Sequence, residues 1–171
     1  LGYQRYWLAE HHNTSSFAGS APEVMIAAVA AATEKINVGS AGIMLPHYSP
    51  LKVAELFRLL ETLYPGRIDL GLGRAPGSDQ RTMRALQPGP QAYPIDVFPQ
   101  QVELLIQFLE DSTGLGGELG GFPIGHPYTG IHATPRGPGL PNMWMLGSGG
   151  DGAIHAAQQG MAYCFAHFIN Q

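Results

Sequence analysis

Cysteine is almost absent from this chain, and long apolar runs and clusters of basic residues are absent altogether. A single cysteine, Cys164, among 171 residues excludes an internal disulfide and a cysteine-based metal cluster, and it fits the reducing cytoplasm. The longest apolar run, residues 24–32, is too short to span a bilayer, and no signal peptide is visible, so we expect a soluble protein. The formal net charge of −4 without any basic cluster makes nucleic acid and anionic membranes poor partners. Small molecules are the expected ligands.

Apolar residues are plentiful, at 44% against 13% charged, and they occur in short runs typical of one compact domain. Five runs predict strands, at residues 6–9, 36–45, 68–72, 143–146 and 161–166. Helical spacing or end signals predict helices at residues 23–33, 50–63, 79–86, 99–110 and 153–159, the first opened by a capping box from Ser20 to Glu23. Strands alternating with helices indicate right-handed βαβ units and a parallel sheet, which is an α/β fold.

A long Gly- and Pro-rich segment, residues 111–141, separates the fourth predicted helix from the fourth predicted strand. Loops of this length are commonly lids or binding loops, so we expect it to shape a pocket. Short extended pieces are expected within it at residues 122–124 and 131–133.

Polar or glycine-rich residues follow all five predicted strands. Because ligands of parallel sheets bind at the carboxyl ends of the strands, five such strand ends predict a single site. The strand ends are Glu10-His11-His12, residues 42–48, Gly73-Arg74, residues 147–152 and His167.

Two of these strand ends suit a phosphate. Gly73 and Gly71 allow a close approach to the backbone, and Arg74 offers a planar fork of donors; the alternative is a core strand whose arginine forms a structural salt bridge. Free N–H groups and a helix dipole favour phosphate at Ser148, Gly149, Gly150, Asp151 and Gly152; the alternative is a plain glycine-rich turn. No acidic residue ends the next strand, so a mononucleotide suits this turn better than NAD.

The pair His11-His12 admits two interpretations. A metal site is not expected, because neighbours on a strand point to opposite faces and no second cluster of ligands follows. The better interpretation makes one histidine a base or hydrogen-bond donor and the other a packing or orienting residue. Ser148 is a poor candidate for a hydrolase nucleophile, because Leu146 stands where the nucleophile elbow requires glycine.

With these residues assembled, the chain resembles the bacterial luciferase-like, flavin-dependent monooxygenases. The resemblance runs through nearly the whole chain, and its segments occur in family order. It rests on residues 6–13, Ser20-Ala21-Pro22, residues 36–45, residues 65–77 and residues 144–148.

The resemblance implies a TIM barrel that binds reduced FMN, supplied by a separate flavin reductase, and that uses O2 to oxygenate an aldehyde-like or other small substrate. Arg74 and the backbone of residues 148–152 would hold the FMN phosphate, and Ala41 and Gly42 would lie against the flavin ring. His11 matches the catalytic histidine of the family. The alternatives are a truncated relative that binds flavin or another phosphate ligand without turnover, and repurposed chemistry, either hydrolytic or dependent on F420.

A complete barrel has eight strands in about 250 residues, whereas this chain accounts only for about strands two to six. Open parallel edges and exposed interior surface favour aggregation unless they are covered. We therefore expect one partial barrel domain, residues 1–171, that either forms a homo-oligomer or is a fragment of a longer protein.

Overall fold

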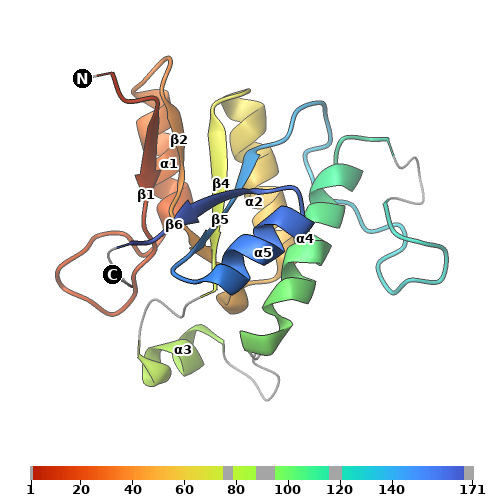
Figure 1. Ribbon diagram of the computed structural model, residues 1–171. Coiled ribbons are helices and arrows are strands. Elements are labelled where there is room, and N and C mark those ends of the chain that lie inside the picture. The colour runs from red at the N-terminus through yellow and green to blue at the C-terminus, as the bar shows by residue number, and fades with distance from the viewer. Residues whose placement is uncertain (1, 75–78, 88–94, 116–120, 168–171) are drawn as a thin grey trace.

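The computed structural model describes residues 2–74, 79–87, 95–115 and 121–167, and it has the shape of an open half-barrel: a curved parallel sheet flanked by helices (Figure 1). The strands are β1 (Arg5–Leu8), β2 (Asn37–Ser40), β3 (Ile43–Met44), β4 (Ile68–Gly73), β5 (Asn142–Gly147) and β6 (Ala162–Phe165). The helices are α1 (Pro22–Ala31), α2 (Pro50–Leu63), α3 (Gln80–Leu86), α4 (Phe98–Asp111) and α5 (Gly150–Gln158), with 3-10 turns η1 (Leu45–His47) and η2 (Ile95–Val97).

The strands are paired in the order β1-β2-β4-β5-β6, every pair is parallel, and β3 pairs with β4 beyond the end of β2. Each crossover between parallel strands must return the chain to the same end of the sheet, which the intervening helices achieve. The predicted α/β fold with an incomplete barrel is confirmed.

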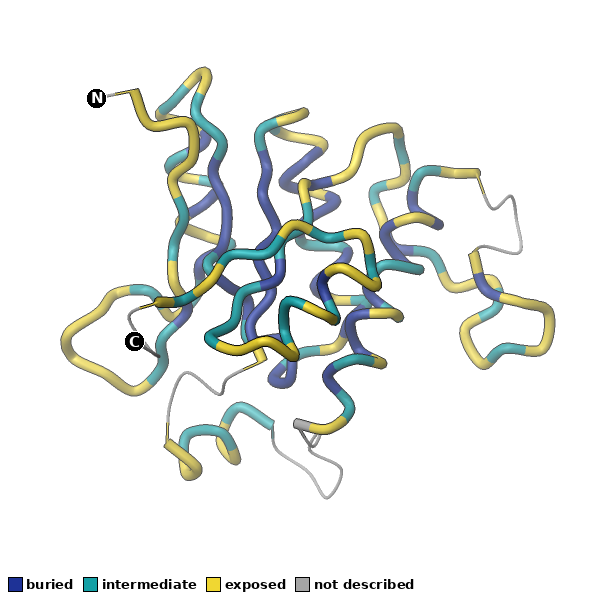
Figure 2. Tube along the Cα trace, viewed as in Figure 1, coloured by how far each residue is buried: buried dark blue, intermediate teal, exposed yellow. Residues whose placement is uncertain are grey.

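The alternation along β4 separates the two faces of the sheet. Ile68, Leu70 and Leu72 are fully buried and belong to the core shared with the helices. The alternate residues Asp69 and Gly71 point to the other face, which is the inner face of the half-barrel. Buried residues accordingly run along β4 and the facing sides of α2 and α4 in Figure 2.

The predicted second strand is split in two by a bulge. Val38 of β2 pairs with Ile68 of β4, and Ile43 of β3 pairs with Leu72 of β4. Five residue steps from β2 to β3 therefore lie opposite four steps along β4. The Ser40 side chain fills the break, because its Oγ donates to the Gly71 carbonyl (2.9 Å) and accepts from the Gly71 N–H (3.0 Å). The peptide bond Ala41–Gly42 within the bulge is cis.

Two local predictions were wrong. Ala21, not Ser20, is the N-cap of α1, and no side chain caps that helix, so the capping box does not form. Pro22 begins α1 instead, with its φ preset and no N–H to satisfy. Residues 122–124 lie in a bend and the start of a turn, residues 131–133 have no regular structure, and neither segment forms a strand.

The long segment after α4 does not cover the expected site. It joins the end of α4 to the amino end of β5, which is the opposite end of the sheet from residues 9–20 and α3 (Figure 1). The buried guanidinium of Arg58 holds its described part, donating to the carbonyls of Pro135 (3.1 Å) and Gly137 (2.9 Å) and to that of Gly139. Burial lowers the pKa of Arg58, although Glu61 opposes this shift. The part of the segment that the structure describes is an anchored crossover at the amino end, and it forms no lid over the carboxyl ends of the strands.

No helix in the described ranges combines the length and the apolar character needed to cross a bilayer.

Candidate functional site

The carboxyl ends of the strands bring the predicted site residues to one edge of the sheet. The register pairs Leu8 with Ser40, Met44 with Gly73 and Leu72 with Met145. Continued by two residues, the last pairing places Arg74 level with Gly147 on the neighbouring strand. The strand ends that follow β1, β3, β4 and β5 therefore form one continuous rim.

A fully buried carboxylate, Glu10, organises the β1 end of this rim. Its Oε2 accepts from the backbone N–H of Met44 (2.8 Å), and its Oε1 accepts from the hydroxyl of Tyr48 (2.7 Å). The Nε2 of His12 lies 2.7 Å from the same Oε1. Burial first, and the bond to Glu10 second, raise the pKa of Tyr48 far above its ordinary value, so the phenol stays protonated.

The two adjacent histidines have different surroundings. The ring of His11 stacks on Phe17 in the following loop, with centroids 4.9 Å apart, and its backbone N–H donates to the Gly19 carbonyl (2.9 Å). The ring of His12 turns toward Glu10 and meets the buried His47 edge-on at 6.1 Å. The two histidines therefore lie in separate environments, and their predicted roles stay predictions.

The loop after β1 is tied to α3. Asn13, which has a positive φ of 53°, donates to Asp79 (3.3 Å) and to the hydroxyl of Thr82 (3.0 Å). Asp79 caps α3 by accepting from the N–H groups of Arg81 and Thr82. Bonds from Thr82 and Arg81 lower the pKa of Asp79 to about 2. These contacts place α3 beside the histidine loop.

Glycines in β4 and in the bulge after β2 allow two segments of backbone to lie very close together. A Cβ on Gly71 would lie 2.1 Å from the Ser40 carbonyl oxygen, and one on Gly42 would lie 2.8 Å from the Gly71 carbonyl oxygen. A Cβ on Gly73 would meet the Met44 sulfur at 3.1 Å. The group that comes closest to the backbone of Gly71 is therefore the Ser40 carbonyl, and the one closest to Gly42 is β4, so on these sides the chain packs against itself. Ala41 is half-buried.

The glycine-rich turn after β5 is open. Gly149 is the N-cap of α5 and Gly150 its first residue, and a Cβ on either would meet nothing within 4 Å. Tyr163 of β6 stabilises the turn: its hydroxyl donates to the Gly149 carbonyl (2.9 Å), and its ring packs against Gly147 and Gly152. Asp151 is exposed in the first turn of α5. Its carboxylate would repel an anion, so only its backbone N–H suits a phosphate.

Arg74 is exposed and, within the described residues, forms no hydrogen bond or ion pair. Residues 75–78, which follow it in the predicted glycine-arginine motif, lie outside the described part of the chain. An exposed guanidinium on the strand end next to the one that carries an open helix N-terminus is a donor set suited to a dianionic phosphate. His167, the last of the predicted strand-end residues, is also exposed, with its ring 6.1 Å from that of Phe165.

The described part of the chain contains no group of three or more residues able to hold a metal ion.

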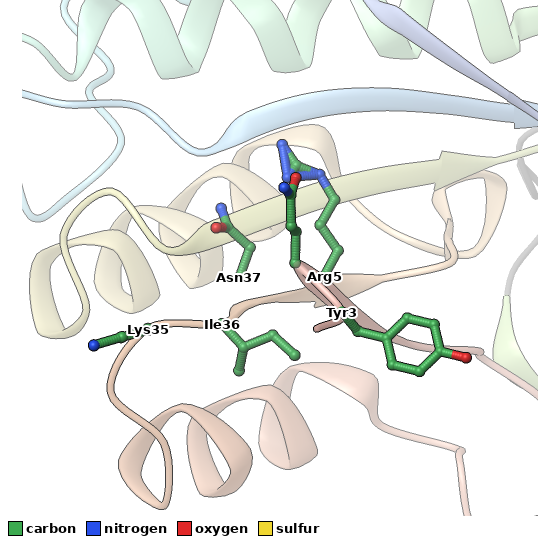
Figure 3. A pocket seen from close by; sticks show the side chains of 6 residues that line it. Tyr3, Arg5, Lys35, Ile36 and Asn37 are labelled. Carbon is green, nitrogen blue, oxygen red and sulfur yellow. The ribbon is translucent and has the colours of Figure 1, made fainter. Parts of the chain in front are cut away.

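A second buried carboxylate lies at the opposite, amino end of the sheet. Asp69 accepts from the indole N–H of Trp7 (2.8 Å) and the amides of Asn142 (3.0 Å) and Asn37 (3.5 Å), and it pairs with Arg5 at 3.5 Å. The Arg5 guanidinium also lies over the ring of Trp144, 5.1 Å from its centroid. Figure 3 shows Arg5 and Asn37 in the adjoining shallow pocket, with the Lys35 side chain directed away from them.

Sequence reasoning missed the roles of Glu10, Tyr48 and Asp69. For Glu10 and Asp69 the available signal was an acidic residue in an apolar strand context, which burial permits only when donors surround it. Tyr48 carried no such signal, because its partner is 38 residues away in sequence.

Residues 1–170 match the family model described as "Luciferase-like monooxygenase". The chain is 50% identical over 169 residues to an uncharacterized Bacillus subtilis protein, YceB, covering 99% of this chain and 48% of that protein. It is 44% identical over 169 residues to the N-acetyl-S-alkylcysteine monooxygenase of Bacillus subtilis, with the same coverage. The chain thus spans about half the length of the curated relatives it matches.

Among solved structures, apo-MsnO8 superposes with a TM-score of 0.82 at 42% identity over 98% of this chain and 46% of that one. The oxygenating constituent of 3,6-diketocamphane monooxygenase from Pseudomonas putida, solved in complex with FMN, superposes with a TM-score of 0.65. Its identity is 19%, over 95% of this chain and 47% of that one, so it supports the fold alone.

Proposed function

This chain belongs to the luciferase-like monooxygenase family, and from that premise we propose that its carboxyl rim is half of a site at which reduced FMN and O2 oxygenate an aldehyde-like or other small organic substrate. A separate flavin reductase would supply the reduced FMN, in the cytoplasm. The observation that carries the proposal is that exposed Arg74 and the open turn at Gly149 and Gly150 follow adjoining strands, β4 and β5.

The donor set fits a flavin mononucleotide phosphate. The Arg74 guanidinium can bind two phosphate oxygens, and the first N–H groups of α5 have no partner within the helix. Backbone N–H groups at Ser148, Gly149, Gly150, Asp151 and Gly152 would complete the phosphate site. Ala41 would face the flavin ring, with Gly42 contributing backbone only, because a Cβ there would collide with β4.

When bound, reduced flavin supplies the electrons that activate O2. The chain's own contribution is to bind the phosphate, to orient the ring and to place His11 as a proton donor or acceptor near the reacting atoms. The His11 ring stacks on Phe17 of the following loop, so a movement of that loop would change how far the ring is covered. Shielding the reaction from water is the remaining task of the site.

Titration of the purified protein with FMN, followed by absorbance and fluorescence, tests the binding step. Micromolar affinity is expected, and no binding at that concentration would remove the proposal. Binding of F420 instead of FMN would favour the related deazaflavin chemistry. FMN binding without O2-dependent product from reduced flavin and an aldehyde would favour a binding protein without turnover.

Two substitutions separate the proposed roles. Arg74→Ala should weaken FMN binding by about 1.5–3 kcal/mol, since a charge-assisted contact is lost. His11→Ala should leave FMN affinity nearly unchanged and abolish oxygenation. Arg84→Ala, which removes an exposed arginine of α3, is the matched control and should change neither. Equal losses of FMN affinity in the Arg74 and His11 variants would contradict separate roles.

A further inference from the structure

We propose that Glu10 is a positioning residue that fixes His12 in its Nε2–H tautomer and so presents Nδ1 as a hydrogen-bond acceptor at the carboxyl rim. The inference rests on the proposed function in one respect, that this rim is where the reaction takes place. It adds His12 to the site as a second acceptor beside His11.

The direction of each hydrogen bond at Glu10 follows from chemistry. The Met44 backbone N–H can only donate, so Glu10 Oε2 accepts there (2.8 Å). The Tyr48 phenol remains protonated and donates to Oε1 (2.7 Å). An unprotonated Nε2 of His12 would set its lone pair against that same oxygen at 2.7 Å, which is repulsive. His12 must therefore carry its proton on Nε2.

The other nitrogen of His12 is left for a different partner. His12 Nδ1 forms no hydrogen bond to any residue that the structure describes, and the side chain is only 11% exposed, so bulk water reaches it poorly. The titratable groups around it are Glu10 on its own segment, His47 at 6.1 Å and Tyr48, which in turn feels Glu23 of α1. A neutral imidazole with Nε2–H held by a carboxylate has one acceptor lone pair, on Nδ1. Its complementary partner is a hydroxyl or N–H donor of the bound reactant.

Histidine tautomers can be measured directly, whether or not flavin is bound. Long-range 1H–15N correlation spectra of the protein labelled with 15N-histidine distinguish the two tautomers at about pH 8, where free imidazole is neutral. The His12 signals are assigned with a His12→Asn variant. We expect the Nε2–H form to predominate for His12. A mixture, or a predominant Nδ1–H form, in the unmodified protein would overturn the proposal without any further variant.

Glu10→Gln should invert the tautomer. The Met44 N–H still requires an acceptor, so the glutamine oxygen must face Met44 and its NH2 group must face Tyr48 and His12. The Nε2 of His12 would then have to accept, which moves the imidazole proton to Nδ1. A His12 that keeps the Nε2–H form in a folded Glu10→Gln protein would overturn the positioning role.

Tyr48→Phe is the matched control, because it deletes a hydrogen bond to the same carboxylate oxygen without changing what that oxygen can accept. His12 should keep the Nε2–H form in this variant, and loss of that form would show that Glu10 alone does not hold it, against the proposal. Glu10→Gln is used only if circular dichroism shows that it folds. If it does not fold, the tautomer spectra of the unmodified protein and of Tyr48→Phe still test the proposal.

Function provides a second, separable readout. Folded Glu10→Gln should lose at least tenfold in oxygenation rate with FMN affinity unchanged within twofold. Unchanged turnover despite an inverted tautomer would remove His12 Nδ1 from the reaction. Absence of FMN binding in the unmodified protein would defeat the proposed function and leave the tautomer result standing, so the two failures are distinguishable.

Discussion

The two ends of the sheet each bury a carboxylate completely, but they surround it with different donors. Asp69, at the amino end, is held by an indole, two amides and a guanidinium. Glu10, at the carboxyl end, is held by a backbone N–H, a phenol and an imidazole. The partners of Asp69 cannot change protonation in the physiological range, whereas an imidazole can.

The segments next to the two carboxylates, the long crossover after α4 and helix α3, are also held differently. At the amino end, Arg58 fastens the long crossover through three backbone carbonyls, and Asp111 fastens it again by accepting from the Gly121 N–H (2.8 Å) and pairing with His132 (2.8 Å). At the carboxyl end, α3 is joined to the histidine loop through exposed polar contacts of Asn13. The amino end is thus held by contacts of the buried residues Arg58 and Asp111, whereas α3 at the carboxyl end is held by exposed ones.

Removal of Asp69 is the strongest test of this comparison. Asp69→Ala leaves the indole N–H of Trp7 without its acceptor, and an unsatisfied buried donor costs about 1–3 kcal/mol, whereas Arg5, which is exposed, turns to water. We expect the free energy of unfolding in urea to fall by that amount. The fraction that remains folded should bind FMN with unchanged affinity, because the proposed phosphate site lies at the opposite end of the sheet.

Lys35→Ala is the control for that variant. Lys35 is an exposed residue of the same amino-end pocket (Figure 3), so its removal should change the free energy of unfolding by less than about 0.5 kcal/mol. A loss below about 1 kcal/mol in Asp69→Ala would show that the cluster is not the anchor described here, since even one unsatisfied buried donor costs that much.

Sequence reasoning succeeded where a pattern is local. Alternation along β4 and helical spacing in α2 identified the parallel half-barrel, and the glycines after β5 predicted the edge at which its strand ends meet. It failed where the outcome depended on distant partners. The glycine at position 71 predicted a close approach to the backbone, but not that the approaching group would be the Ser40 bulge of the chain itself. Similarly, loop length alone predicted a lid after α4, although an αβ connection must lead to the amino ends of the strands.

Gly71 provides a second test, at the boundary between the two ends. Gly71→Ala would place a Cβ 2.1 Å from the Ser40 oxygen, so β2 and β4 must separate at the bulge. Overpacking of this kind costs about 1–3 kcal/mol, measured by urea unfolding. Amide hydrogen exchange should accelerate at Met44, beyond the bulge, more than at the Trp7 indole at the amino end.

Gly150→Ala is the matched control, because a Cβ there meets nothing within 4 Å and alanine favours helix at that position. Its free energy of unfolding should equal or slightly exceed that of the unmodified protein. Equal destabilisation in both variants would mean that the close approach at Gly71 is not what shapes the carboxyl end.

The smallest expected effect is local to α3. Hydrogen bonds from Thr82 and Arg81 lower the pKa of Asp79 to about 2 from its ordinary 3.8, so the folded state holds the proton less tightly than the unfolded state. The stabilisation of the helix start is therefore complete above about pH 4 and is lost as the pH falls through 2. Amide exchange at Thr82, corrected for the intrinsic pH dependence, should accelerate in that window. Asp79→Asn keeps a capping oxygen without a charge, so its corrected exchange should not vary with pH. The same acceleration in both proteins would assign it to general acid unfolding, and the carboxyl end would then be no more loosely held than the amino end.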